Sequence, residues 1–167
     1  AAPPPGFGLV AAYGFNEGTG TSSVDSSGNA NTVSLGGATW STQGKFGTAL
    51  SFTGSQYATV SDANTLDLTN AMTLEAWVYP TAAPAGWTSV LFKEQPGDIV
   101  YGLYSGSNAP DRPTAWGYVT TETGVTGTSA LATNTRTHLA ATFDGTTLRL
   151  FEPGSTGLDK GAEKRLD

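Results

Sequence analysis

Short runs in which apolar and polar residues alternate recur from Leu9 to Phe151, and clusters of Gly, Asn, Asp and Ser separate them. Alternation puts successive side chains on opposite faces of a strand, and these turn residues end strands. Turn signals at intervals of about ten residues are typical of an all-β sandwich. We therefore expect about nine strands, at 9–15, 49–52, 57–60, 72–79, 89–93, 99–104, 114–120, 138–143 and 146–151.

The strongest local signal is a hairpin late in the chain. Asp144 and Gly145 lie between the apolar runs 139–143 and 146–151. A two-residue type I′ turn needs positive φ at both central positions, and Gly adopts it without strain. We predict such a turn with Asp144 and Gly145 at its centre.

Composition narrows the possible partners. The 167 residues allow one domain with a core, and the net charge of −6 argues against nucleic acid or an anionic membrane surface as partner. Without cysteine, the chain has no disulfide or thiolate chemistry. No run approaches the roughly 20 apolar residues of a membrane helix, so we expect a soluble mature form that suits calcium or neutral sugars.

The chain divides into three expected segments. The Pro-rich residues 1–8 favour an extended conformation and are interpreted as a linker or processed N-terminus. Residues 9–151 hold the predicted sandwich. Seven of the 16 residues in 152–167 are charged, so we expect a mobile tail there.

Four segments in a fixed order carry a resemblance to a known family. They are LVAAYGFNEGTGTSSVDSSGNAN, GKFGTALSFTGSQYATV, MTLEAWVYP and RTHLAATFDGTTLRLF. Together they resemble the laminin-G-like jellyroll domain of the concanavalin A-like lectin and glucanase class. The resemblance implies a two-sheet antiparallel jellyroll sandwich, secreted as an extracellular module that binds carbohydrate or protein.

Members of this family would continue with several further strands after the late hairpin, whereas this sequence turns into the charged segment. A sheet that lacks a strand exposes backbone donors and acceptors along its edge. We expect another chain to complete that edge by β-augmentation or by strand exchange in a homo-oligomer, or the strands to be absent from a less stable domain.

The polar loop from Asp25 to Asn31, with the sequence DSSGNAN, offers a carboxylate and amide oxygens of the kind that calcium prefers. In the resembled family such a stretch often borders a structural calcium. The candidate ligands are Asp25, Asn29, Asn31 and Glu17. The alternative is that these residues only build a turn through Asx-type hydrogen bonds.

Aromatic side chains on or beside the central strands and their loops are candidates for stacking on sugar rings. The candidate ligand-binding residues are Trp87, Tyr101, Tyr104, Trp116 and Tyr118. Alternation puts Tyr101 and Tyr104 on opposite faces, and aromatic residues also dominate sandwich interiors, so core packing is the alternative for each. We interpret Trp40 and Trp77 as structural.

Catalysis has little support. A glucanase needs two carboxylates close together, and the matching strand offers Glu75 alone, which we expect to accept hydrogen bonds from a neighbouring loop. His138 is the only histidine, and no nucleophile-elbow motif surrounds a serine. The sequence predicts a non-catalytic carbohydrate-binding module with a structural calcium, the alternatives being an adhesion module that binds protein and, third, a glucanase-type hydrolase.

Overall fold

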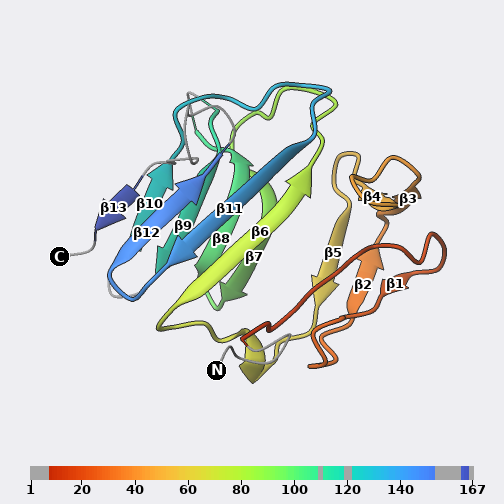
Figure 1. The fold of residues 1–167 in the computed structure, drawn as a ribbon, viewed down its shortest axis with the longest axis horizontal. Coiled ribbons are helices and arrows are strands. Elements are labelled where there is room, and N and C mark those ends of the chain that lie inside the picture. Colours follow the sequence, from red (N-terminus) through yellow and green to blue (C-terminus); the bar gives the residue numbers. More distant parts are fainter. Residues whose placement is uncertain (1–7, 109–110, 119–121, 153–162, 166–167) are drawn as a thin grey trace, which may run out of the picture. The chain divides into compact units, whose positions relative to one another are not determined.

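The computed structural model describes residues 8–108, 111–118, 122–152 and 163–165 (Figure 1). Regular structure in these residues is β, apart from one short 3-10 helix, and every sheet in it is antiparallel. This confirms the predicted all-β, concanavalin A-like class. The chain forms two compact units, residues 1–67 and 68–167, which are described separately.

The first unit contains two small sheets. Strands β1, β2 and β5 form one sheet in the order β1-β2-β5, and β3 pairs with β4. Among the described apolar residues of this unit, Val33 and Ala38 are buried. The elements are β1 (Ser22–Ser23), β2 (Val33–Gly36), β3 (Thr39–Ser41), β4 (Ala49–Ser51), β5 (Tyr57–Val60) and the 3-10 helix η1 (Asn64–Leu66).

The predicted strand at 9–15 is wrong, because this segment belongs to no strand. The Ala12 N–H donates to Asp25 at 2.9 Å, and the Ala12 carbonyl accepts the Ser26 N–H at 2.8 Å. Phe15 has a φ of 51°, which ends the extended conformation. The polar groups of this segment therefore bind the 25–31 loop instead of a neighbouring strand.

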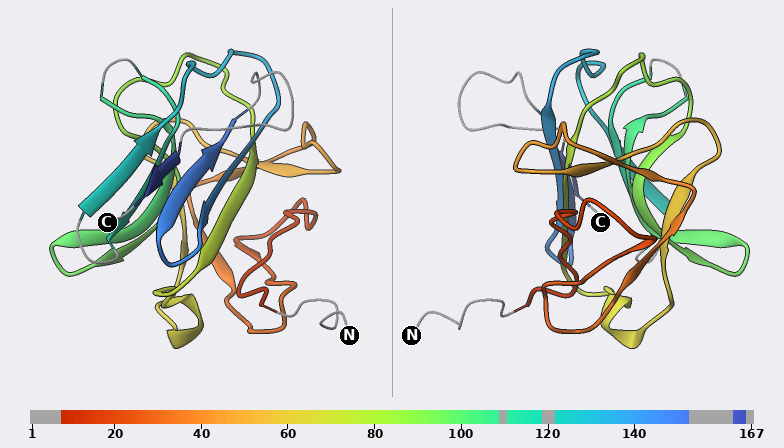
Figure 2. Two further views of the ribbon diagram at one scale, coloured as in Figure 1. Left: turned by 60° about the vertical axis from the view of Figure 1, so that its left-hand side comes forward. Right: turned by 90° about the vertical axis from the view of Figure 1, so that its right-hand side faces the viewer.

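The second unit is a sandwich of two four-stranded sheets, with strand orders β10-β9-β8-β7 and β13-β12-β11-β6 (Figure 2). Six of its strands overlap predicted ones, whereas β10 and β13 were not predicted from the sequence. The strands are β6 (Met72–Val78), β7 (Thr88–Gln95), β8 (Asp98–Gly106), β9 (Thr114–Tyr118), β10 (Glu122–Thr126), β11 (Thr137–Phe143), β12 (Thr147–Phe151) and β13 (Glu163–Arg165).

The core of this unit lies between the two sheets. Alternate residues of β6 and β11 point inward, as the pattern of Met72 and Leu74 predicts. Leu103 from the facing sheet packs in the same cluster, as do Leu139 and Leu150, and all three are fully buried. The outward faces also carry exposed aromatic side chains, Phe92 on one sheet and Trp77 on the other.

The hairpin between β11 and β12 is confirmed, but its predicted turn type is wrong. The Asp144 N–H donates to the Thr147 carbonyl at 3.3 Å, which makes Gly145 and Thr146 the central residues. Only Gly145 has positive φ, at 96°, as in a type II′ turn. The Asp144 carboxylate selects this register, because it accepts the N–H groups of Thr146 and Thr147.

Parts of the segment predicted as a mobile tail belong to the fold. Glu152 is buried, and its Oε1 accepts the Thr128 N–H at 2.5 Å and the Thr128 hydroxyl at 2.6 Å. Residues 163–165 form β13 and pair with 147–149 of β12. Residues 1–7, 153–162 and 166–167 lie outside the described part, so the linker at 1–8 and the mobility of the remaining tail stay predictions.

Candidate functional site

Aromatic side chains gather on the outward face of the β10-β9-β8-β7 sheet. In the strand register, Phe92 lies opposite Gly102, Gly102 opposite Trp116, and Trp116 opposite Gly124. Ala115, next to Trp116, points into the core, so Trp116 points outward. We define the aromatic face as Trp87, Phe92, Tyr104 and Trp116.

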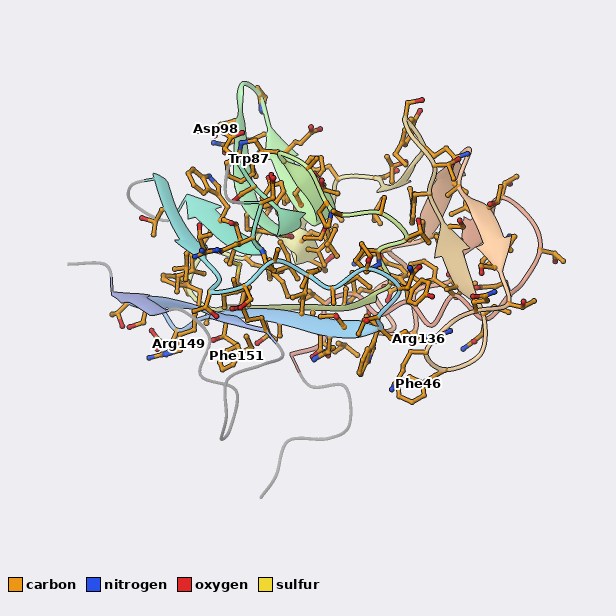
Figure 3. The ribbon with its side chains drawn as sticks, turned by 90° about the horizontal axis from the view of Figure 1, so that it is seen from above. Phe46, Trp87, Asp98, Arg136, Arg149 and Phe151 are labelled. Atoms are coloured by element: carbon orange, nitrogen blue, oxygen red, sulfur yellow. The ribbon has the colours of Figure 1, made fainter. Side chains whose placement is uncertain are left out.

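Three of these rings form one cluster. The Trp87 ring is edge-on to Tyr104, with centroids 5.0 Å apart and planes at 75°, and edge-on to Trp116, at 5.7 Å and 81°. Such edge-to-face pairs are favourable and hold rings in a fixed geometry. Figure 3 shows Trp87 on the side of its sheet that faces away from the sheet of Arg149 and Phe151. The sequence-predicted Trp87, Tyr104 and Trp116 thus come together.

Exposure separates the rings that can meet a ligand from those that support them. Trp87 is 46% exposed and Phe92 43%, whereas Tyr104 is 4% exposed. Trp116 is half-buried. Trp87, Phe92 and Trp116 therefore present ring surface to solvent, and Tyr104 packs beneath Trp87 and supports it.

Two glycines let the rings lie close to the sheet. A Cβ added at Gly124 would overlap with the six-membered ring of Trp116, and one added at Gly102 would lie 2.8 Å from Cε2 of Tyr104. Glycine inside a strand often marks such a close approach. Phe92 and these two glycines were not recognised from the sequence as parts of a site, although glycine within predicted strands was the available signal.

The charged group that acts on the aromatic face is the carboxylate of Glu94. Burial, and to a smaller extent the negative charge of Glu94, raise the pKa of Tyr104 above its usual value. Glu94 is exposed and lies two residues beyond Phe92 on β7. The Tyr104 hydroxyl therefore stays a neutral group at physiological pH, beside a carboxylate.

The two remaining aromatic candidates lie apart from this cluster. Tyr101 is buried in the core on the opposite side of the sheet, where it packs with Leu103. Tyr118 is the last residue of β9, and its side chain lies outside the described part of the structure. Tyr101 therefore serves the core rather than the aromatic face.

The predicted calcium loop is organised around Asp25. Its Oδ1 accepts the N–H groups of Ala12 at 2.9 Å and Ser27 at 2.8 Å. Its Oδ2 accepts the Ser27 hydroxyl at 2.7 Å and the Asn31 N–H at 3.1 Å. Burial alone would raise the pKa of Asp25, but these hydrogen bonds together outweigh it and lower the pKa below its usual value.

The amide candidates direct their NH₂ groups at main-chain carbonyls. Asn29 Nδ2 donates to the carbonyls of Leu9 and Val10, each at 3.1 Å. Asn31 Nδ2 donates to the Val10 carbonyl at 2.8 Å and to the Thr65 hydroxyl at 3.1 Å. These bonds fasten the 9–15 segment to the loop.

Glu17 has a similar structural role near β1. Its Oε1 accepts the Val24 N–H at 2.8 Å and the Ser23 hydroxyl at 2.9 Å. The Val24 hydrogen bond is the main cause that lowers the pKa of Glu17. Glu17 and Asp25 thus bind separate sets of donors.

As arranged, these residues do not fit a calcium site. Both Asp25 oxygens are occupied by N–H and O–H donors, and the two amides present nitrogen instead of the oxygen that calcium requires. Among the described residues, no group of three or more His, Cys, Asp or Glu side chains is arranged to hold a metal ion. The hydrogen bonds form the turn that is the alternative interpretation, and calcium binding stays a prediction.

Glu75 lies on the outward face of β6, where its Oε2 is 3.5 Å from His138 Nε2. We expected a neighbouring loop to supply its partner, but the partner comes from the adjacent strand β11. Trp77, interpreted from the sequence as structural, is 45% exposed on the same face. Trp40, in contrast, donates its indole N–H to the Gly20 carbonyl at 2.8 Å.

These features define a β-sandwich that presents aromatic side chains outside its core. The laminin-G family of the Concanavalin A-like lectin/glucanases superfamily matches residues 52–155, and the chain belongs to this family. No curated protein and no solved structure matches the chain significantly. No helix in the described residues is long and apolar enough to span a membrane.

Proposed function

We propose that this chain is a non-catalytic extracellular module that binds neutral carbohydrate on its aromatic face. The family supports a binding module in general, and its domains are typically extracellular. The observation that carries the finer proposal is the exposure of Trp87 and Phe92 beside Trp116 on the outward face of a rigid sheet.

The aromatic face exposes large apolar rings to water. Large apolar side chains grouped on one solvent face are typical of binding surfaces, whereas singly exposed ones are common on any protein. Flat rings can stack on the C–H faces of pyranose sugars, and rings on strands hold a fixed geometry. The carboxylate of Glu94 lies on this side of the sheet and favours neutral sugars over anionic ones.

We propose a non-catalytic module because the strand on which glucanases carry their carboxylates offers Glu75, and this carboxylate contacts the imidazole of His138. Glycoside hydrolysis needs two carboxylates on either side of the scissile bond. Glu75 instead lies against His138, and both side chains are exposed on the outward face of their sheet. A neutral oligosaccharide incubated with the protein should therefore be recovered intact.

The test is a glycan array followed by calorimetric titration of the best neutral oligosaccharide. We expect Trp87→Ala and Trp116→Ala each to weaken binding about tenfold or more, since each removes a stacking ring. Trp77→Ala is the matched control, because Trp77 is equally exposed on the other sheet. Unchanged affinity in both test variants, or no neutral glycan bound at all, would overturn the proposal.

A second candidate function is a protein-binding module completed by strand exchange. Among the described strands of the second unit, the seven-residue β6 and the eight-residue β7 lie at the edges of their sheets. Long edge strands can accept a strand from another chain. A mass in solution that rises with protein concentration, measured by light scattering, would support this candidate, and a monomer at all concentrations would exclude exchange between copies.

A further inference from the structure

The outward face of β6 and β11 carries aromatic and charged side chains outside the core. In the register, His138 lies opposite Trp77, and Ala140 lies opposite Glu75. Tyr79 and Arg136 extend the same two strands by one position. We define the β6–β11 face as Glu75, Trp77, Tyr79, Arg136 and His138.

These five side chains form two groups of contacts on one face, a pair and a set of three. The Arg136 guanidinium carbon lies 5.1 Å from the centroid of the Tyr79 ring. The His138 ring is tilted against Trp77, with centroids 5.1 Å apart and planes at 41°, and its Nε2 lies 3.5 Å from Glu75. Each ring is therefore paired with a group that carries or can carry positive charge.

The rings are open to a ligand. Trp77 is 45% exposed and Tyr79 is 38% exposed. Arg136 is also exposed, and Figure 3 shows it at the start of β11. An arginine stacked on an aromatic ring keeps its N–H donors at the edge of the guanidinium plane, where a carboxylate can meet two of them.

The chemistry of this face differs from that of the aromatic face. The aromatic face lies beside the carboxylate of Glu94, and alternation places Lys93 on the opposite side of the same strand. The β6–β11 face combines two exposed rings with a guanidinium at one end and, at the other, a carboxylate that is paired with an imidazole. It therefore suits a ligand that carries both a sugar ring and a negative charge.

We propose that the β6–β11 face is a second binding site, specific for a carboxylate-bearing sugar such as a uronic acid. The Arg136 guanidinium binds the carboxylate, and the Trp77 ring stacks on the sugar. Glu75 accepts a hydroxyl hydrogen bond at the far end, about 13 Å from Tyr79 at the rise of a β-strand. The site is separate from the aromatic face, because the core lies between the two sheets.

The net charge of the chain makes this proposal specific. The protein carries a net charge of −6, so long-range electrostatic repulsion opposes the binding of a polyanion. Binding of an acidic oligosaccharide must therefore come from local contacts. A sulfated oligosaccharide of equal charge serves as the control, because its geometry does not match a planar carboxylate.

The test is a titration of the full chain with galacturonate oligomers, with the galacturonate monosaccharide, and with a neutral oligosaccharide of equal length. We expect Arg136→Gln and Trp77→Ala each to weaken the galacturonate complex about tenfold or more, since each removes a charge-assisted contact or a stacking ring. Binding of the monosaccharide as well would indicate a terminal acidic sugar as the natural ligand, and binding of oligomers alone would indicate a polymer.

Variants of the aromatic face distinguish the two sites. Trp116→Ala should leave galacturonate binding unchanged, even if the aromatic face proves not to bind neutral sugar. An unchanged thermal midpoint in Arg136→Gln shows that a loss of binding is not a loss of folding. No galacturonate binding by the wild-type chain, equal binding of the sulfated control, or full affinity in Arg136→Gln and Trp77→Ala would overturn the proposal.

Discussion

Replacing Asp25 with Ala removes an acceptor that four donors share. The donors are the N–H groups of Ala12, Ser27 and Asn31 and the Ser27 hydroxyl. A hydrogen bond to a charged group contributes about 1.5–3 kcal/mol, but neighbouring bonds do not add fully and water can reach part of this loop. We expect Asp25→Ala to destabilise the first unit by about 3 kcal/mol, and Asp25→Asn, which keeps one acceptor oxygen, by about half of that.

The same contacts predict the pH dependence. Because the folded pKa of Asp25 lies below its unfolded value, its stabilising contribution is complete above the unfolded pKa. It is lost as the pH falls through the folded pKa. The stability difference between the wild type and Asp25→Ala should therefore be constant at neutral pH and shrink below a pH of about 4.

The assay is urea unfolding followed by tryptophan fluorescence, with amide hydrogen exchange at Ala12, Ser27 and Asn31. Trp40 is the one tryptophan in residues 1–67, so three Trp→Phe changes elsewhere make the signal report on the first unit. Equal exchange of these amides in the wild type and the variant would refute the reasoning.

Calcium and chelator provide the second arm of this experiment. If Asp25 bound calcium, a hundredfold excess over the dissociation constant would stabilise the wild type by about 2.7 kcal/mol. The hydrogen-bonded turn predicts no calcium-dependent shift of the midpoint. A shift that disappears in Asp25→Ala would show that the loop rearranges into a metal site.

Three further predictions follow from single contacts. Gly124→Ala should displace the Trp116 ring and so weaken neutral glycan binding, which calorimetry measures. It should lower the free energy of unfolding in urea by at most about 1 kcal/mol, because a half-buried ring can swing outward. Glu152→Ala should destabilise the second unit by about 1–3 kcal/mol in urea, because it leaves the Thr128 N–H and hydroxyl without their buried acceptor, and Glu152→Gln should cost less. The Asp144 carboxyl should titrate well below its usual pKa by carbon NMR, because of the Arg149 guanidinium and the turn N–H groups, and Arg149→Gln should move that pKa upward.

An alternating pattern predicts a strand correctly where the segment also finds a neighbouring strand to pair with. Residues 57–60 and 72–78 alternate and form β5 and β6 as expected. Residues 9–15 show the same kind of pattern without forming a strand, because their hydrogen bonds go to the 25–31 loop. Residues 163–165 are all charged, so their pairing with β12 depends on register and not on an apolar pattern. Local alternation does not contain this information.

The candidate site was predictable by residue type but not by arrangement. Aromatic residues on or beside predicted strands pointed to Trp87 and Trp116, whose rings are in contact in the structure. That Gly124 lets the Trp116 ring lie against the sheet depends on a cross-strand register, which the sequence does not show. Trp77 was interpreted as structural. Alternation along β6 places it on the same face as Glu75, opposite the buried Met72 and Leu74, and this already indicated an exposed position.

The four indole N–H signals offer the most direct test of the central claim, that the aromatic face binds neutral sugar. In a proton–nitrogen NMR titration with the best neutral oligosaccharide, each tryptophan reports on its own surface. We expect the chemical shifts of Trp87 and Trp116 to change with one shared dissociation constant, and those of Trp40 and Trp77 to stay unchanged. Saturating ligand that leaves the Trp87 and Trp116 signals unmoved, or that moves only Trp77, would contradict it.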